Sequence, residues 1–119
     1  MRVSVLIAAA LSLMLLSLLP AQALAAEVLQ VRSATLLQVG DRNRTYSVQI
    51  ACVQVEPEDE QQAQDWMRRA LPRRRRVNLR PEGSADGVLL ARVTPIGNDL
   101  DLGAALVNEG LAQVTCPGA

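Results

Sequence analysis

An apolar segment at the N-terminus decides how much of this chain is available to fold. Val3 to Leu19 contains only three polar residues, all serines, and follows the positive start Met1-Arg2. Pro20 then breaks a helix, and Ala23-Leu24-Ala25 has the small-x-small pattern that signal peptidases cleave. We therefore expect residues 1–25 to be a cleaved signal peptide. The protein would then be exported to a periplasm, a lumen or the extracellular space.

An uncleaved membrane anchor is the alternative, because the apolar run is only slightly shorter than the ~20 residues that span a bilayer. Cleavage would leave residues 26–119, which are 94 residues and enough for one domain with one modest core. Without Arg2 the chain carries 11 arginines and no lysine, against 12 acidic residues. This balance gives no reason from net charge to expect a polyanionic partner, and we expect a monomer.

Two cysteines remain after the signal segment, Cys52 and Cys116. An even number of cysteines in a small exported domain favours a disulfide, and a loop of this length would stabilise the fold by roughly 4 kcal/mol. Two buried free thiols are the alternative. A metal or redox role has little support, because the chain has no Cys-x-x-Cys motif and no histidine.

The first half of the domain has the patterns of three strands. Val28 to Val39 reads as a pair of strands, and Gly40 to Asn43 is a polar turn that leads into a third strand over Thr45 to Val53. Alternate residues of the third strand form one apolar face, which predicts that this face is buried. The residues of that face are Tyr46, Val48, Ile50 and Cys52.

A helix follows, beginning in the acidic segment Glu56 to Glu60. Pro57 suits a first helical turn, and the acidic side chains complement the positive end of the helix dipole. Apolar residues then recur at helical spacing and predict one buried stripe. The stripe consists of Ala63, Trp66, Met67, Ala70 and Leu71. Its position on the stripe makes Trp66 a core residue rather than a binding residue.

The second half contains two strands and a second helix. Val77 to Arg80 and Val88 to Thr94 read as the strands, with Pro81 to Gly87 as a loop between them. Asp101 is placed to cap a helix over Leu102 to Glu109. The predicted fold class is therefore mainly β with two helices, a five-stranded OB-type barrel in the order β-β-β-α-β-β-α.

Two segments make this expectation more specific. The residues from Asn98 to Leu102 and from Ala105 to Val114 resemble the C-terminal signature of staphylococcal-nuclease-like (thermonuclease) domains. Gln49 to Gln54 resembles the third strand of the same family, which usually reads arginine, leucine, x, glycine, isoleucine, aspartate. The resemblance extends over nearly all of residues 26–119 and implies an OB-type barrel.

The resemblance also implies which residues a nuclease would need. Members of the family hydrolyse phosphodiesters with a calcium ion held by carboxylates, a glutamate that acts on water, and two arginines on the phosphate. Here Ala34 stands at a carboxylate position of the first hairpin, and Gln54 stands at the aspartate after the third strand. Gln49 and Val88 stand at the two arginine positions. We therefore expect a non-catalytic binding or envelope module without a cofactor or metal.

One catalytic element has a counterpart, because Pro57-Glu58 matches the family's proline-glutamate pair if one residue is inserted. A carboxylate in the first turn of a helix is the more ordinary role for Glu58. The alternative function is a calcium-dependent nuclease whose site is rebuilt from Glu56, Glu58, Asp86 and Asp41. Calcium would be a cofactor only under this alternative.

A run of arginines is the other candidate for function. It could hold an anionic partner or surface, but it could equally be a solvated helix end neutralised by nearby acids. Nucleic acid has weak support as the partner, because Tyr46 and Trp66 are the only aromatic residues on which bases could stack. The predicted patch consists of Arg68, Arg69, Arg73, Arg74, Arg75, Arg76 and Arg80.

Overall fold

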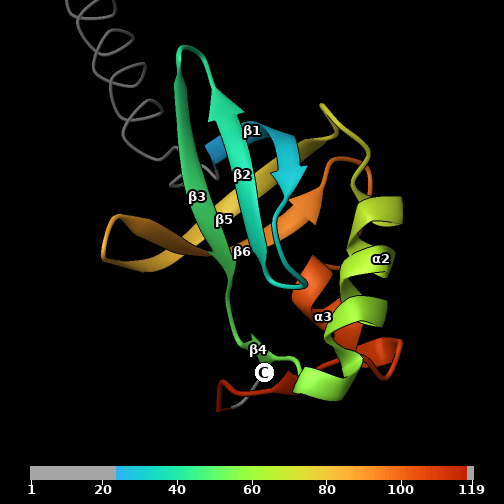
Figure 1. Cartoon of the computed structure of the whole chain (residues 1–119). Coiled ribbons are helices and arrows are strands. Elements are labelled where there is room, and N and C mark those ends of the chain that lie inside the picture. Colours follow the sequence, from blue (N-terminus) through green and yellow to red (C-terminus); the bar gives the residue numbers. More distant parts are fainter. Residues whose placement is uncertain (1–23, 118–119) are drawn as a thin grey trace, which may run out of the picture.

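Alternation of apolar and polar residues builds a closed five-stranded barrel (Figure 1). The fold is a computed structural model that describes residues 24–117. The strands neighbour one another in the order β1-β2-β3-β6-β5, and β5 returns to β1. The barrel strands are β1 (Leu24–Val31), β2 (Leu36–Asp41), β3 (Arg44–Ile50), β5 (Arg76–Ala85) and β6 (Val88–Pro95).

The topology is that of an OB-type barrel, as the sequence predicts. All neighbouring strands are antiparallel except β3 and β6, which pair in parallel through Val48 to Ile50 and Leu89 to Ala91. The helix α2 (Glu60–Ala70) lies between β3 and β5 in the sequence, and α3 (Leu102–Asn108) follows β6. The order of three strands, a helix, two strands and a helix is therefore confirmed.

The barrel interior is filled by aliphatic side chains that point inward from every barrel strand. Val48 and Ile50 are buried as predicted, and Tyr46 packs against the core while remaining half-exposed. No polar or charged residue is buried in the part of the chain that the structure describes. The largest fully buried side chains are Val28, Leu37, Val39, Val48, Ile50, Met67, Val77, Leu79, Val93, Pro95 and Leu106.

The first helix closes one side of the barrel. A short 3-10 turn, η1 (Pro57–Asp59), precedes α2, so the helical segment begins about where the sequence predicts. Ala63, Met67 and Leu71 are buried, and Trp66 packs partly exposed against the same core. The predicted apolar stripe and the core role of Trp66 are both confirmed.

The second helix begins and ends as its sequence predicts. The Asp101 side chain accepts a hydrogen bond from the Ala104 backbone N–H at 3.0 Å, which caps the first turn. Gly110 lies just after the helix with φ +76°, a conformation that glycine adopts without strain. Leu102 and Leu106 are buried in the core cluster, so α3 packs against the barrel.

The third strand is shorter than predicted, and the orientation inferred for Cys52 is wrong. β3 ends at Ile50, and Cys52 lies in a turn with φ +69° and a half-exposed side chain. The turn leads into β4 (Val53–Gln54), which pairs with β7 (Gln113–Val114) in a separate two-stranded sheet. Every second residue stays apolar past Ile50 as far as Cys52, so the sequence pattern did not indicate this turn.

The disulfide between Cys52 and Cys116 is confirmed. It joins residues that are 64 positions apart and ties the turn after β3 to the segment after β7. The Thr115 N–H also donates to the Cys52 carbonyl at 2.9 Å. The C-terminal segment is thus attached to the barrel by a covalent bond as well as by backbone pairing.

The segment predicted as a loop over Pro81 to Gly87 is mostly strand. β5 continues to Ala85 and pairs with β6 through a hairpin whose turn is Asp86-Gly87. The register shifts between Pro81 and Gly83, which marks an irregularity of the bulge type. Proline, glycine and serine are typical of loops, but here this bulge accommodates them in a long curved strand.

The predicted signal peptide lies outside the described residues, apart from Leu24 and Ala25 at the start of β1. Among residues 24–117, no helix has both the length and the apolar character to cross a membrane. The disulfide is compatible with folding in an oxidising compartment.

Candidate functional site

The position that the resemblance assigns to a calcium carboxylate is part of the core. Ala34 lies in the loop between β1 and β2 and is fully buried. Its backbone N–H donates to Oε1 of Glu60 at 2.9 Å, and Gln64 Nε2 donates to the carbonyl of Arg32 at 3.2 Å. Two side chains of α2 therefore hold this loop against the helix. An aspartate in place of Ala34 would have to be buried.

Glu60 is the acid nearest to this loop, and the sequence did not single it out. The candidate Glu58 instead lies exposed in η1. Helical spacing could have distinguished the two acids, because Glu60 lies three residues before the buried Ala63 and four before Gln64, which also contacts the loop. The Glu60 carboxylate already accepts a backbone hydrogen bond, so its observed role is to position the loop.

One of the two arginine positions is filled by an amide that is already hydrogen-bonded. Gln49 lies near the end of β3, and its Nε2 donates to Oγ1 of Thr35 at 2.7 Å. This bond ties β3 to the loop that holds Ala34. Gln49 lacks the guanidinium that would pair with a phosphate.

Gln49 and Val88 do come together, in a groove of about 500 Å³. The groove runs between the start of β2, the end of β3 and the β5–β6 hairpin. Leu90 is 38% exposed there, and Asp86 is the one charged residue of the lining. The lining consists of Leu36, Gln49, Gly83, Ser84, Ala85, Asp86, Val88 and Leu90. We call this surface the apolar groove.

The remaining candidate acids are not brought together. Asp41 ends β2 at the tip of the β2–β3 hairpin, and Asp86 is in the turn of the β5–β6 hairpin. Glu56 precedes η1 and Glu58 lies within it, and η1 follows β4 at the other end of the molecule (Figure 1). Gln54, the last of the substituted family positions, is exposed in β4. Within residues 24–117, no three acids, cysteines or histidines are close enough to hold a metal ion.

The arginines of the predicted patch lie on three segments of the chain, the end of α2, the loop after it and β5. Arg68 and Arg69 lie at the end of α2, and Arg73 and Arg74 are exposed in the loop that follows. The Arg75 guanidinium donates to the Ile96 carbonyl at 2.9 Å. The two remaining arginines, Arg76 and Arg80, lie on β5 and line two different cavities.

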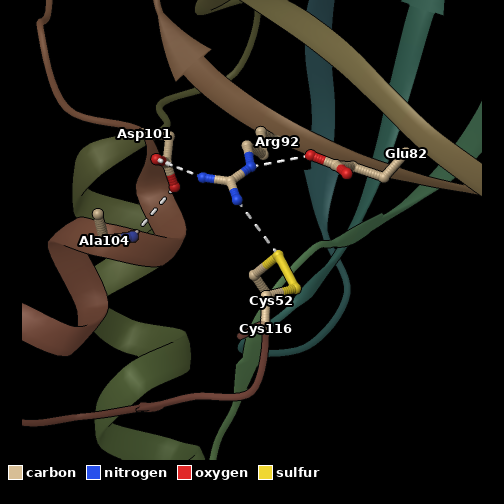
Figure 2. Close-up of polar contacts among 6 residues, drawn as sticks. All are labelled: Cys52, Glu82, Arg92, Asp101, Ala104 and Cys116. Atoms are coloured by element: carbon tan, nitrogen blue, oxygen red, sulfur yellow. Dashed lines mark hydrogen bonds and ion pairs between the residues drawn. A yellow bond between two sulfur atoms is a disulfide. The ribbon is translucent and has the colours of Figure 1, made fainter. Parts of the chain in front are cut away.

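Arg92 is the best-connected polar side chain of the structure, and the sequence analysis missed it (Figure 2). Its Nε donates to Oε1 of Glu82 at 2.8 Å, and its Nη1 lies 4.0 Å from Oδ2 of Asp101. Its Nη2 lies 3.5 Å from Sγ of Cys52. The guanidinium thus links β5, β6, the cap of α3 and the disulfide. The sequence pattern that could have singled out Arg92 is its place on β6 between Ala91 and Val93. These two residues are buried, so the Arg92 side chain must lie on the outer face.

The contacts of Arg92 explain its place without any ligand. Both carboxylates that contact it are on the protein, and Asp101 already caps α3. Arg80 is the residue opposite Arg92 in the register of β5 and β6, and like charges at such positions repel. The two carboxylates offset that repulsion, so the cluster stabilises the fold where β5, β6 and the start of α3 meet.

No protein-family model matches this chain, and no curated protein matches it either.

Proposed function

We propose that this chain is an exported, non-catalytic binding domain of the staphylococcal-nuclease type, with a role in binding or in the cell envelope. The observation that carries the proposal is the apolar groove. Gln49 and Val88 line it where the resemblance expects two arginines, and Gln49 is hydrogen-bonded to Thr35.

Hydrolysis of a phosphodiester needs charge at this place, and the groove does not supply it. A calcium ion would require several oxygen ligands, but Asp86 is the one carboxylate of the groove. Developing negative charge on the phosphate would require guanidinium donors, which contribute most when several act as a unit. A mainly apolar groove with a few polar groups is suited to binding a small ligand.

Export is supported by the disulfide and by the N-terminal sequence. Disulfides persist mainly in oxidising compartments, and this one joins distant parts of the domain. Intact-mass analysis of the protein purified after expression of the full-length gene should give a chain that begins at or near Ala26. Recovery of the full-length chain in the membrane fraction would favour the anchor instead.

A calcium titration tests the non-catalytic assignment at the level of binding. We expect no saturable change in the backbone amide NMR signals of residues 32–36, 49 and 83–90 as calcium chloride is added. A saturable change confined to these residues would contradict the proposal. The Asp86→Asn variant is the control, because Asp86 is the one carboxylate of the groove and a calcium site there would lose affinity in it.

A further inference from the structure

A second cavity lies at the opposite end of the β2–β3 hairpin from the apolar groove. It encloses about 510 Å³ between the start of β1, the hairpin tip and the start of β5. Three arginines line it, Arg42, Arg44 and Arg76. We call it the arginine cavity. The full lining is Ala25, Ala26, Glu27, Leu29, Gly40, Asp41, Arg42, Asn43, Arg44, Thr45 and Arg76.

The strand register brings these arginines together from distant parts of the sequence. Glu27 of β1 is opposite Gly40 of β2 on one side and opposite Arg76 of β5 on the other. Ala26 and Val28 are buried, so Glu27 and its neighbours across the sheet face outward. Arg42 lies in the turn of the β2–β3 hairpin and Arg44 begins β3, and Figure 1 places this hairpin tip at the top of the molecule.

Gly40 leaves room for the Leu29 side chain at the wall of the cavity. A Cβ atom at this position would lie 3.2 Å from Cδ1 of Leu29, closer than ordinary van der Waals contact. A larger residue at this position would have to displace Leu29, which lines the same cavity.

Two of the three cavity arginines lie opposite a carboxylate in the strand register, Arg76 opposite Glu27 and Arg44 opposite Asp41, but neither is an ion pair in the described structure. Among the described residues, none of the ion pairs within 4.0 Å involves Arg42, Arg44 or Arg76. The lining carries three guanidinium groups against two carboxylates, those of Glu27 and Asp41. This contrasts with Arg92, whose charge is offset by two carboxylates of the protein.

Signal-peptide cleavage would increase the positive charge of this cavity. Cleavage after Ala25 removes one lining residue and makes Ala26 the new N-terminus. An α-amino group is mostly protonated at neutral pH, so the processed chain would gain a fourth positive charge in the lining. Ala26 and Glu27 would keep their pairing with Val77 and Arg76 of β5.

We propose that the arginine cavity binds a phosphate group. Arginine guanidinium groups donate paired hydrogen bonds that match phosphate oxygens, and Asn43 and Thr45 add neutral donors at the rim. The phosphate can belong to a free inorganic or organic phosphate or to a lipid headgroup, since both offer the same oxygens. This site is separate from the apolar groove, and its test does not depend on whether the chain hydrolyses nucleic acid.

The test uses the protein purified after expression of the full-length gene, titrated with sodium pyrophosphate and followed by backbone amide NMR. We expect saturable shifts confined to residues 26–29, 40–45 and 76, with an affinity that falls as sodium chloride is raised. In parallel, sedimentation with vesicles of phosphatidylglycerol or of phosphatidylcholine tests the lipid headgroup. Binding to phosphatidylglycerol alone, without pyrophosphate binding, assigns the phosphate to a lipid.

Two triple variants decide whether the cavity is responsible. Arg42→Gln, Arg44→Gln and Arg76→Gln together should weaken binding by about tenfold or more. Arg68→Gln, Arg69→Gln and Arg73→Gln change the net charge equally on another surface, and this control should stay within about twofold. Equal losses in both variants would overturn the proposal. The absence of saturable binding both to pyrophosphate and to phosphatidylglycerol vesicles would also overturn it.

Discussion

The two ends of the β2–β3 hairpin have opposite chemistry. At one end, Leu36, Val88 and Leu90 form a groove with one carboxylate and no cation. At the other end, the hairpin tip contributes two of the three arginines that line the second cavity. The strands β2, β3 and β5 contribute residues to both surfaces. The difference shows that the residues at the strand ends, and not the barrel fold, decide what each surface can bind.

The two ends also differ in how firmly they are held. The loop beside the groove is fixed by hydrogen bonds from Glu60, Gln64 and Gln49. The arginine cavity is built on a hairpin turn, and no helix covers it in the described structure (Figure 1). We therefore expect substitutions near the groove to change stability and substitutions at the cavity to change binding.

The largest effect should come from the disulfide. Replacing Cys52 and Cys116 by serine should lower the free energy of unfolding by about 4 kcal/mol in the chain-entropy model, because the bond closes a long loop. Urea unfolding monitored by Trp66 fluorescence measures this. Pyrophosphate binding by the folded variant should persist, because the bond lies away from the arginine cavity. Equal unfolding midpoints for the wild type with and without reductant would contradict this prediction.

A smaller loss of stability should follow from removing the contact between α2 and the loop. Glu60→Ala leaves the N–H of buried Ala34 without its acceptor, which should cost about 1–2 kcal/mol. Glu60→Gln is the matched control, because it keeps an oxygen acceptor and should lose less. Thermal unfolding of both variants tests this. Equal destabilisation by the two substitutions would mean that the hydrogen bond does not hold the loop.

The smallest expected effect is a change in the pKa of Tyr46, which lies at the cavity end of the β2–β3 hairpin. Burial and, second, the nearby Asp41 carboxylate raise the pKa of the Tyr46 hydroxyl, and Arg44 lowers it in part. The folded state thus holds this proton more tightly than the unfolded chain, whose tyrosine pKa is about 10. This contribution to stability is present below pH ~10 and is lost as pH rises through the folded pKa.

Absorbance titration isolates this group, because Tyr46 is the only tyrosine. We expect Arg44→Gln to raise the Tyr46 pKa further and Asp41→Asn to lower it. Shifts in the opposite directions would show that the two charges are not arranged around Tyr46 as described.

Much of the fold could be predicted because local signals agree with the tertiary structure. Asp101 and Gly110 mark the limits of α3, and the apolar stripe of α2 meets the core as its spacing indicates. Two predicted strand ends were wrong, because β3 ends before Cys52 and β5 continues past Pro81. At the first, apolar alternation continued past the strand end. At the second, a bulge absorbed residues that usually form loops.

The candidate surfaces were harder to predict, because contacts between distant residues create them. Arg76 belonged to a run of arginines in the sequence, but the barrel places it beside Arg42 and Arg44. Arg92 is isolated in the sequence, and only the folded chain brings Glu82, Asp101 and Cys52 to it. Sequence spacing places residues on one face of an element, whereas strand register decides which faces meet.

A nuclease assay on the purified protein tests the central claim most directly. DNA and RNA are incubated at several calcium concentrations with the wild type and with Glu58→Gln. We expect no calcium-dependent hydrolysis by either protein, because loss of even one preorganised charge donor typically costs ~100-fold in rate and several are missing here. Robust calcium-dependent cleavage by the wild type that Glu58→Gln abolishes would contradict the non-catalytic assignment and establish a rebuilt nuclease site.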